Sequence, residues 1–596
     1  MAPKDNRNMP NAKKPASQGN PSDAAAILRR ALRARAVLFA LGAFVAVFAV
    51  LDTAGPVQDS DFWWHLKTGQ LIAAAGRVPT ADVFSYTIRG RPWVAFEWLS
   101  QLTYWKIYER FSFAGIFWLR ESLVVLIFGL LLSFGASEPW LAAAALIAAL
   151  PFARMGVTDR PQMFTFLLIV VYRLLTPALL EARSRRRLFG LAALFAALHV
   201  LWANLHGGAS LVGILIVGAH AAGLWWVAPE QRRRTAARLG GLALLLAAAS
   251  LANPVGWILY KHLARTLLDP GSKLVGEWLP PKFSDSYCRY YCLWLGAAFA
   301  ASFGLPAGRR ATAWALLLFF GGIEAFQSAR NLVLGFFVIA PDALAGLAAL
   351  GSSWSRIPEP VVAKSQKGRR SPEVRDGRIW FLLAGPAALA AVLFAARPAM
   401  LARCYPAYFA SDSLVKEYGR GAADFLASHR MKGRMLNDYI LGGYFIWRGR
   451  EVFVDGRSLE YGGDFLKRAL RWSDPAVFAE LDARWHFDYA VFRQGESYLA
   501  RRFDEDPDWS CVYFDDATLV YAHKGRADSR VARTLGYRFL RPNETSFDYL
   551  VPHLRDPRER VAVLLDAFRA EKSADREFSY NIHRLRRFVV QDLRAR

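Results

Sequence analysis

Long apolar stretches separated by short polar loops dominate the first two thirds of the chain. Each is close to the roughly 20 residues that a helix needs to cross the hydrocarbon core of a bilayer. They lie at about 36–54, 113–136, 139–153, 162–180, 188–204, 209–228, 239–252, 288–306, 311–329, 331–350 and 379–396. This pattern predicts about 11 spans. The count depends on the stretches at 139–153 and 239–252, which are short.

After residue 397 the apolar runs give way to mixed polar and alternating segments. Strands are expected at 434–438, 451–455, 489–493 and 519–522, with helices near 462–471 and 475–484. Short strands that alternate with helices indicate a small α/β layer. We therefore expect a polytopic α-helical membrane protein with a C-terminal soluble α/β domain over 397–524, followed by a helical, Arg-rich extension over 525–596.

Composition supports this class. The 596 residues are 54% hydrophobic, and 75 Lys and Arg outnumber 50 Asp and Glu to give a net charge of +25. A charge of this size can indicate nucleic-acid binding. Here much of it lies in short loops between apolar stretches, so we expect topogenic charge, some contact with anionic lipid head groups and no nucleic-acid partner. Four cysteines imply no disulfide framework.

The positions of the basic residues predict the orientation, because cytoplasmic loops carry an excess of Lys and Arg. A basic tail over 1–34, expected to be disordered, places the N-terminus in the cytoplasm. Counting spans through the membrane domain (35–396) then puts the basic clusters at 183–187, 232–238 and 309–310 and the linker over 351–378 on the same side. The C-terminal domain is therefore expected on the outer face, which in a bacterium is the periplasmic side of the inner membrane.

Unusual polar residues gather on the face predicted to be outside. These clusters lie at 58–65, 96–98, 158–162, 202–208, 253–257, 277–278 and 328–331. Ionisable groups in or near a membrane are costly, so their convergence on one face indicates a site. Arg120 and Glu121, inside a span, are instead expected to form a pair within the bundle.

The first outer loop, residues 55–112, contains two expected helices. One runs from Phe62 to Ala75 and is stopped by Gly76, and the other runs from Trp98 to Phe111. Their Trp and Tyr content is typical of helices that lie in the membrane interface. The segment between them, at 82–90, is expected to form a strand and a turn.

Two carboxylates, Asp59 and Asp61, stand at the start of this loop, with His65 one helical turn beyond Asp61. Carboxylates at this spacing can share a divalent cation, or one can act as a base while the other holds a ligand. The alternative is structural: Asp61 or Ser60 can cap the helix that follows.

These segments resemble the GT-C superfamily of membrane glycosyltransferases, and more narrowly a group of bacterial membrane proteins related to it. The resemblance covers residues 35–520. Its motifs are DFWWHLKTG (61–69), GRVP (76–79), FSY (84–86), EWLS (97–100), DRP (159–161), WANLHGG (202–208) and NP (253–254). Related chains often have His at the position of Phe96, so no histidine role is expected there.

The resemblance implies an enzyme that moves a sugar from a polyprenyl-phosphate donor to an outer-face glycan, lipid or protein acceptor, with inversion. Asp59 or Asp61 would act as the general base, and Glu97 is a further candidate catalytic carboxylate. Candidates for binding the lipid phosphate are His65, Arg160, His206 and Arg330. A divalent cation, Mg or Mn, held by Asp59 and Asp61 is the expected cofactor.

Alternatives to these roles remain open. Arg160 and Arg330 could snorkel to the interface, and His206 could bond the end of its helix. The turn formers in the C-terminal domain, at 437–438, 442–444 and 455–457, could bind a ligand at strand ends or could simply make turns. The rival functional class is a non-catalytic lipid or glycan transporter, or an envelope assembly subunit. A transporter predicts polar residues along the whole bundle, whereas the clusters found here stop at one face.

Overall fold

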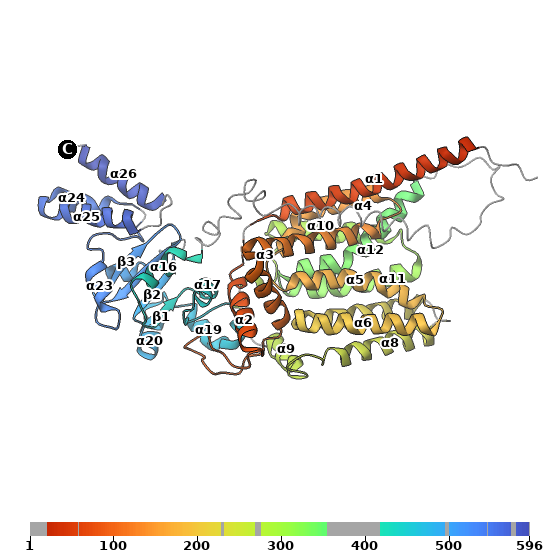
Figure 1. Ribbon diagram of the computed structural model, residues 1–596, viewed down its shortest axis with the longest axis horizontal. Helices are drawn as coiled ribbons and strands as arrows, with labels where there is room; N and C mark the ends of the chain where they lie inside the picture. Colours follow the sequence, from red (N-terminus) through yellow and green to blue (C-terminus); the bar gives the residue numbers. More distant parts are fainter. Residues whose placement is uncertain are drawn as a thin grey trace, which may run out of the picture.

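The computed structural model describes residues 21–354 and 418–594, apart from gaps at 56, 58, 228–229, 231, 269–273, 275, 495–499, 545 and 574–579. The expected span at 379–396 and nearly all of the linker at 351–378 lie outside the described residues. Figure 1 shows a bundle of long helices with a smaller α/β domain at one end. The expected fold class, a polytopic helical membrane protein with a C-terminal α/β domain, is confirmed.

The bundle consists of helices that lie alongside one another (Figure 1). In chain order they are α1 (Pro21–Thr53), α3 (Trp98–Phe134), α4 (Pro139–Ala153), α5 (Gln162–Leu180), α6 (Arg185–Leu205), α7 (Leu211–Val227), α8 (Arg232–Ala249), α10 (Ser286–Ser302), α11 (Ala307–Leu316), which continues as η6 (Leu317–Glu324), and α12 (Asn331–Trp354). A short helix, α9 (Ile258–Leu268), follows α8.

Seven segments among the described residues are long and apolar enough to cross a membrane. They are Ala36–Thr53, Trp98–Phe134, Pro139–Gly156, Gln162–Leu180, Arg185–Leu205, Gly207–Trp225 and Asn331–Ser353. The expected spans at 239–252, 288–306 and 311–329 correspond to α8, α10 and α11 with η6, which do not meet the same test of length and hydropathy. The count of about 11 therefore stays a prediction.

The first outer loop contains the two expected helices. Helix α2 (Phe62–Ala75) ends at Gly76, whose φ of 64° is the left-handed geometry that glycine adopts readily. The second helix, expected to end at Phe111, and the span expected from 113 form one element, α3, but the non-helical dihedrals of Ser112 (φ 56°, ψ −153°) separate its two helical segments. Phe62, Trp63 and Trp64 of α2 are buried within the protein, and the interfacial location of this helix stays a prediction.

The C-terminal domain is built on a four-stranded sheet in the order β1-β2-β4-β3. Its strands are β1 (Met435–Asn437), β2 (Tyr489–Arg493), β3 (Trp509–Phe514) and β4 (Thr518–His523). β1 and β2 are parallel, and the other pairs are antiparallel. The strand expected at 451–455 is not formed, and β3 was not expected.

Short helices surround this sheet. They are α16 (Arg420–Ser428), α17 (Gly442–Trp447), α18 (Ser458–Tyr461), α19 (Gly463–Ala469), α20 (Pro475–Trp485) and α22 (Arg502–Glu505). The expected helical extension follows as α23 (Ser529–Leu535), α24 (Val551–Arg555), α25 (Pro557–Ser573) and α26 (Tyr580–Arg594). In Figure 1, α24 to α26 lie at the end of the molecule farthest from the bundle, and α17 lies beside α2.

The first outer loop is joined to this domain by buried polar contacts, which explains why 451–455 is not a strand of the sheet. Ser85 forms a parallel bridge with Val452, and Thr87 Oγ1 donates to the carbonyl of Phe453. The Arg457 guanidinium bonds both Asp82 and Asp455. The turn residues around 455–457 therefore form part of an interface between two segments that are far apart in sequence.

Buried ion pairs also lie within the bundle. Arg120 bonds Glu121 at 2.9 Å, as expected, and Asp159 at 3.2 Å. Deeper in the bundle, Arg173 pairs with Asp342, which Arg309 also contacts at 3.1 Å. Arg173 is about 16 Å along α5 from the start of that helix. The expectation that polar groups stop at one face is therefore wrong.

Candidate functional site

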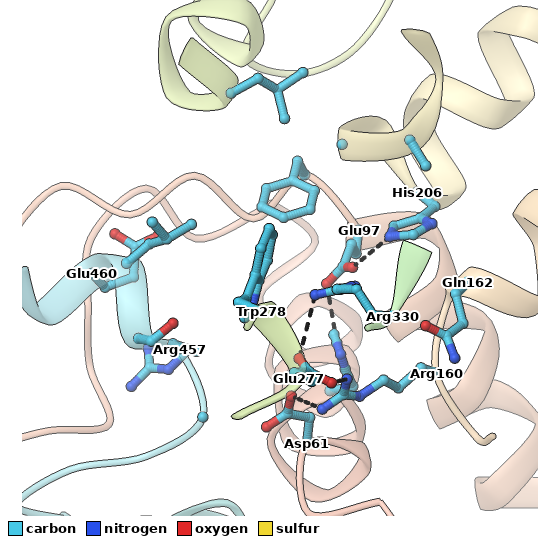
Figure 2. Close-up of a pocket in the computed structure, with 18 of the residues that line it drawn as sticks. Asp61, Glu97, Arg160, Gln162, His206, Glu277, Trp278, Arg330, Arg457 and Glu460 are labelled. Carbon is cyan, nitrogen blue, oxygen red and sulfur yellow. Dashed lines mark hydrogen bonds and ion pairs between the residues drawn. The ribbon is translucent and has the colours of Figure 1, made fainter. Parts of the chain in front are cut away.

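A cavity of about 680 Å³ lies where the bundle meets the C-terminal domain. From the bundle side it is lined by Asp61 and His65 of α2, Glu97 before α3, Arg160 before α5, His206 after α6 and Arg330 before α12. Figure 2 shows the labelled Asp61, Glu97, Arg160, His206 and Arg330 gathered on one side, with Arg457 and Glu460 of the C-terminal domain on the other. Six of the seven predicted site residues therefore line one cavity; Asp59 lies behind Arg160.

The site residues occupy similar places in the fold. Asp61, Glu97, Arg160 and Arg330 each stand one or two residues before the first residue of a helix, respectively α2, α3, α5 and α12. Four helix N-termini therefore lie at one cavity. The helix dipole gives each N-terminus a partial positive charge, so this end of the bundle favours an anion.

Arg160 links the two aspartates. Its Nε lies 2.6 Å from Asp59 Oδ2, and its Nη2 lies 2.5 Å from Asp61 Oδ2. Asp59 Oδ1 also accepts the backbone N–H of Asp61 at 2.9 Å, which fixes the turn. Asp61 is at the N-cap position of α2, but its side chain makes no capping hydrogen bond. Its carboxylate thus faces the cavity and the guanidinium.

The same guanidinium reaches a third carboxylate. Arg160 Nη1 lies 3.0 Å from Glu277 Oε2, and Arg330 Nη1 lies 3.3 Å from Glu277 Oε1. The Arg330 guanidinium also lies over the ring of Trp278, 4.6 Å from its centroid, where a cation–π contact holds it. Both arginines therefore point into the cavity as ion-paired groups rather than outward toward an interface.

Glu97 stands between two histidines. Its Oε1 lies 3.4 Å from His206 Nε2, and its Oε2 lies 3.6 Å from His65 Nδ1. Burial raises the pKa of Glu97 to about 8, lowers that of His206 to about 3 and lowers that of His65 well below its ordinary value. All three groups are therefore mainly uncharged at neutral pH.

Hydrogen bonds hold both rings in place. Trp202 Nε1 donates to Thr165 Oγ1, and the Thr165 hydroxyl is hydrogen-bonded to His206 Nδ1 at 2.8 Å. His206 Nε2 is the nitrogen that faces Glu97. Gln101 Nε2 donates to His65 Nδ1 at 3.1 Å. The His206 side chain is thus fixed by Thr165, while its backbone N–H donates to the Trp202 carbonyl at the end of α6 at 2.9 Å.

The C-terminal domain forms the opposite wall. Tyr439, Gly456, Arg457 and Glu460 line the cavity, and the backbone of Gly456 lies directly against the Asp61 carboxylate. Tyr439 donates a hydrogen bond to the Gly456 carbonyl at 3.2 Å. Burial raises the pKa of Glu460 to about 7. Residues 439–440 and 456–460 therefore make one side of the cavity, whereas the turn formers at 437–438 and 442–444 do not line it.

Sequence reasoning gave no role to several of these residues. Glu277 and Trp278 were recognised only as a polar cluster in an outer loop, and Gly456 only as part of a turn. Thr165 and Glu460 carried no signal, because a lone polar residue in an apolar stretch or in a polar domain is common. The pairing of Glu277 with two arginines depends on the packing of three loops.

The donor set does not fit the divalent cation that the two aspartates suggested. Both carboxylates are paired with the Arg160 guanidinium, whose positive charge stands where a cation would have to bind. Among the described residues, no three His, Cys, Asp or Glu side chains converge in a way that could hold a metal ion. The site as folded is arranged around arginine.

No protein-family model and no curated protein matches the chain. Among solved structures, it is similar to ArnT from Cupriavidus metallidurans in the apo state, at 16% identity and a TM-score of 0.45, over 84% of this chain and 99% of that one. The same ArnT bound to undecaprenyl phosphate is similar at 16% identity and a TM-score of 0.43, over 82% of this chain and 97% of that one. The oligosaccharyltransferase of Archaeoglobus fulgidus in the apo form is similar at 12% identity and a TM-score of 0.47, over 82% of this chain and 74% of that one. Structural likeness at this level does not identify the reaction, which depends on the side chains of the site.

Proposed function

We propose that this protein is a membrane glycosyltransferase that transfers a sugar from a polyprenyl-phosphate donor to an acceptor hydroxyl. One observation carries the proposal: the Asp61 carboxylate faces a cavity in which two guanidinium groups and four helix N-termini converge. A base beside an anion-binding site is what transfer from a phosphate leaving group requires. The cavity lies between the bundle and the C-terminal domain.

In the proposed reaction, Asp61 accepts the proton of the acceptor hydroxyl. The hydroxyl oxygen attacks the anomeric carbon and forms the new glycosidic bond. The bond from that carbon to the phosphate oxygen breaks, and its electron pair stays on the phosphate. Attack and departure on opposite faces of the carbon invert its configuration. Arg160 and Arg330 stabilise the charge that develops on the phosphate, because a guanidinium fork matches phosphate oxygens.

Asp59 acts as a positioning residue in this scheme. It does not line the cavity, and it holds both the Arg160 guanidinium and the backbone of Asp61. Burial raises its pKa to about 6, with Arg160 opposing the rise, so it is mainly ionised at neutral pH. No step is assigned to a metal ion, because Arg160 occupies the place between the two aspartates.

The rival function is transport of a lipid or glycan. The buried Arg173, Asp342 and Arg309 cluster favours it, since ionisable groups deep in a bundle mark ion or substrate pathways in transporters. The cavity, however, opens between the bundle and the C-terminal domain, and its charged groups stand at helix ends rather than along the bundle. That placement favours an enzyme.

The test is turnover by the purified protein with a polyprenyl-phosphate sugar. We expect release of the carrier phosphate only when an acceptor is present. Replacing Arg160 or Arg330 by Gln should weaken binding of the carrier by roughly 10- to 100-fold, since a charge-assisted contact contributes about 1.5–3 kcal/mol. Arg173→Gln serves as the comparison: it is expected to leave carrier binding unchanged. If the protein moves the carrier lipid across a vesicle membrane and shows no acceptor-dependent release of the carrier phosphate, transport is favoured instead.

A further inference from the structure

The carboxylate of Glu277 makes contacts that a phosphate group would also make. One of its oxygens lies 3.0 Å from Arg160 Nη1 and the other 3.3 Å from Arg330 Nη1, so it bridges two guanidinium groups. A bound phosphate commonly makes the same arrangement, in which two of its oxygens contact two different guanidinium groups. Figure 2 shows Glu277 within the cavity, between Asp61 and Arg330.

The charges of the cluster imply that a phosphate group and the Glu277 carboxylate compete for Arg160 and Arg330. Arg160 already forms ion pairs with Asp59 and Asp61. Among the residues that the structure describes, Arg330 has one ion-pair partner, Glu277. A phosphate that approached Arg330 with Glu277 in place would meet a carboxylate on the same guanidinium. Like charges at such separations repel strongly outside bulk water. Anion binding here therefore requires Glu277 to give way.

The side chain of Glu277 is placed to move while its backbone stays. Its side chain is 37% exposed, against 17% for Arg160 and 28% for Arg330. The Glu277 carbonyl accepts the backbone N–H of Arg330 at 3.2 Å and the Ser328 hydroxyl at 2.8 Å. Rotation about the side-chain bonds can thus withdraw the carboxylate into the cavity without breaking these backbone contacts.

We propose that Glu277 is an exchangeable counter-ion, whose carboxylate the phosphate group of the carrier lipid displaces from Arg160 and Arg330. The proposal rests on the proposed function, because it takes the carrier phosphate as the ligand. The exchange keeps the two guanidinium groups charge-balanced before and after binding. Burial acts to raise the pKa of Glu277, but Arg330 and Arg160 hold it below its ordinary value, so the counter-ion is charged at neutral pH.

A purely structural role for Glu277 predicts the opposite sign. If its carboxylate is needed to position Arg330, then removing the charge loosens the arginine and weakens phosphate binding. If it competes with phosphate, then removing the charge strengthens binding. The Trp278 ring beneath Arg330 supports the second case, since it holds the guanidinium independently of Glu277.

The experiment measures binding of undecaprenyl phosphate and of undecaprenol to the full-length protein in detergent. Glu277→Gln should bind the phosphate about 2- to 30-fold more tightly, the change expected when two partly exposed ion pairs of about 0.2–1 kcal/mol each no longer compete. Its affinity for undecaprenol should not change. Glu277→Asp keeps the charge on a side chain one methylene shorter, so it should show a smaller gain.

Asp285→Asn is the matched control: it removes one carboxylate from the same loop region, where Asp285 contacts Tyr287 and neither arginine. It should bind as the wild type does. Equal or weaker phosphate binding by Glu277→Gln would overturn the proposal. Because the measurement needs no turnover, a wild-type protein that binds phosphate but transfers no sugar would reject the proposed function and leave this inference standing.

Discussion

Gly456 of the C-terminal domain lies so close to Asp61 that a Cβ atom at position 456 would stand 1.7 Å from Asp61 Oδ1. Gly456→Ala must therefore move the carboxylate or the loop. A shift of about 1 Å in a catalytic group can reduce the rate by about 100-fold, so we expect at least a tenfold loss of acceptor-dependent turnover. Gly240→Ala, in open space on α8, should have no effect. Full turnover by Gly456→Ala would contradict the placement of Asp61.

Asp61 and Asp59 should differ in kinetics. Asp61→Asn keeps the size of the side chain but removes the base, so kcat should fall by about 10²–10⁴-fold while the carrier still binds. Asp59→Asn disturbs Arg160 instead, and it should act mainly on KM. Steady-state kinetics on both variants separate these effects. Equal losses in kcat would mean that the two aspartates act as one unit.

Glu97 should make stability fall as pH rises. Its carboxyl keeps a proton up to a pKa of about 8 in the folded protein, whereas the unfolded chain releases it near 4.5. The folded state therefore holds the extra proton between these values, and its stabilising effect is complete below pH 4.5 and lost as pH rises through 8. The slope is at most about 1.4 kcal/mol per pH unit.

Thermal unfolding between pH 7 and 8 is the window to compare, because there His65 and His206 are mainly neutral in both states and Glu460, whose pKa is about 7, becomes mainly ionised. Glu97→Gln should flatten the fall in Tm across that window. A variant whose Tm falls as steeply as that of the wild type would show that another group carries the slope.

The joint between the first outer loop and the C-terminal domain should be costly to break. Arg457 is buried and bonds Asp82 and Asp455, so Arg457→Met leaves two buried carboxylates without their cation. We expect a loss of about 3–5 kcal/mol in the free energy of unfolding. Glu451→Gln removes the exposed ion pair between Arg89 and Glu451, which joins the same segments, and should cost under about 1 kcal/mol. Denaturant unfolding compares the two.

The orientation remains a prediction from charge. A reporter enzyme that is active only in the cytoplasm, fused after Arg596, should be silent if the C-terminal domain lies outside. The same reporter fused after Arg234, in a basic cluster expected inside, should be active. Strong activity of the first fusion would mean that the predicted membrane orientation is reversed and that the cavity lies on the cytoplasmic side.

Local signals predicted much of the membrane half. The helix at Phe62–Ala75 was bounded correctly because Gly76 supplies the left-handed residue that ends it. The second loop helix was also bounded correctly at Phe111, because the non-helical dihedrals of Ser112 separate it from the span that follows within α3. The convergence of Asp61, Glu97, Arg160, His206 and Arg330 could be expected because their segments fall at one end of successive spans.

Contacts between distant segments could not be read from the sequence. The strand expected at 451–455 has the alternation of a strand, but its backbone bonds Phe84 and Ser85 in place of a sheet neighbour. Arg173 and Asp342 escaped notice because each is a single charge in a long apolar run, and only the packing of α5 against α12 pairs them. The role of Glu277 likewise could not be predicted, because it depends on contacts with Arg160 and Arg330, which are 117 and 53 residues away in the sequence.

The ion pair between Asp82 and Arg457 joins segments that the ribosome makes at different times. The ribosome makes Asp82 more than 300 residues before Arg457, an interval of roughly 20–70 s at about 5–20 residues per second. Until the later segment arrives, Asp82 has no cation and Asp61 has no facing wall. A nascent or truncated chain thus carries the whole bundle without a finished cavity, and the last part of the protein to be made decides when the site exists.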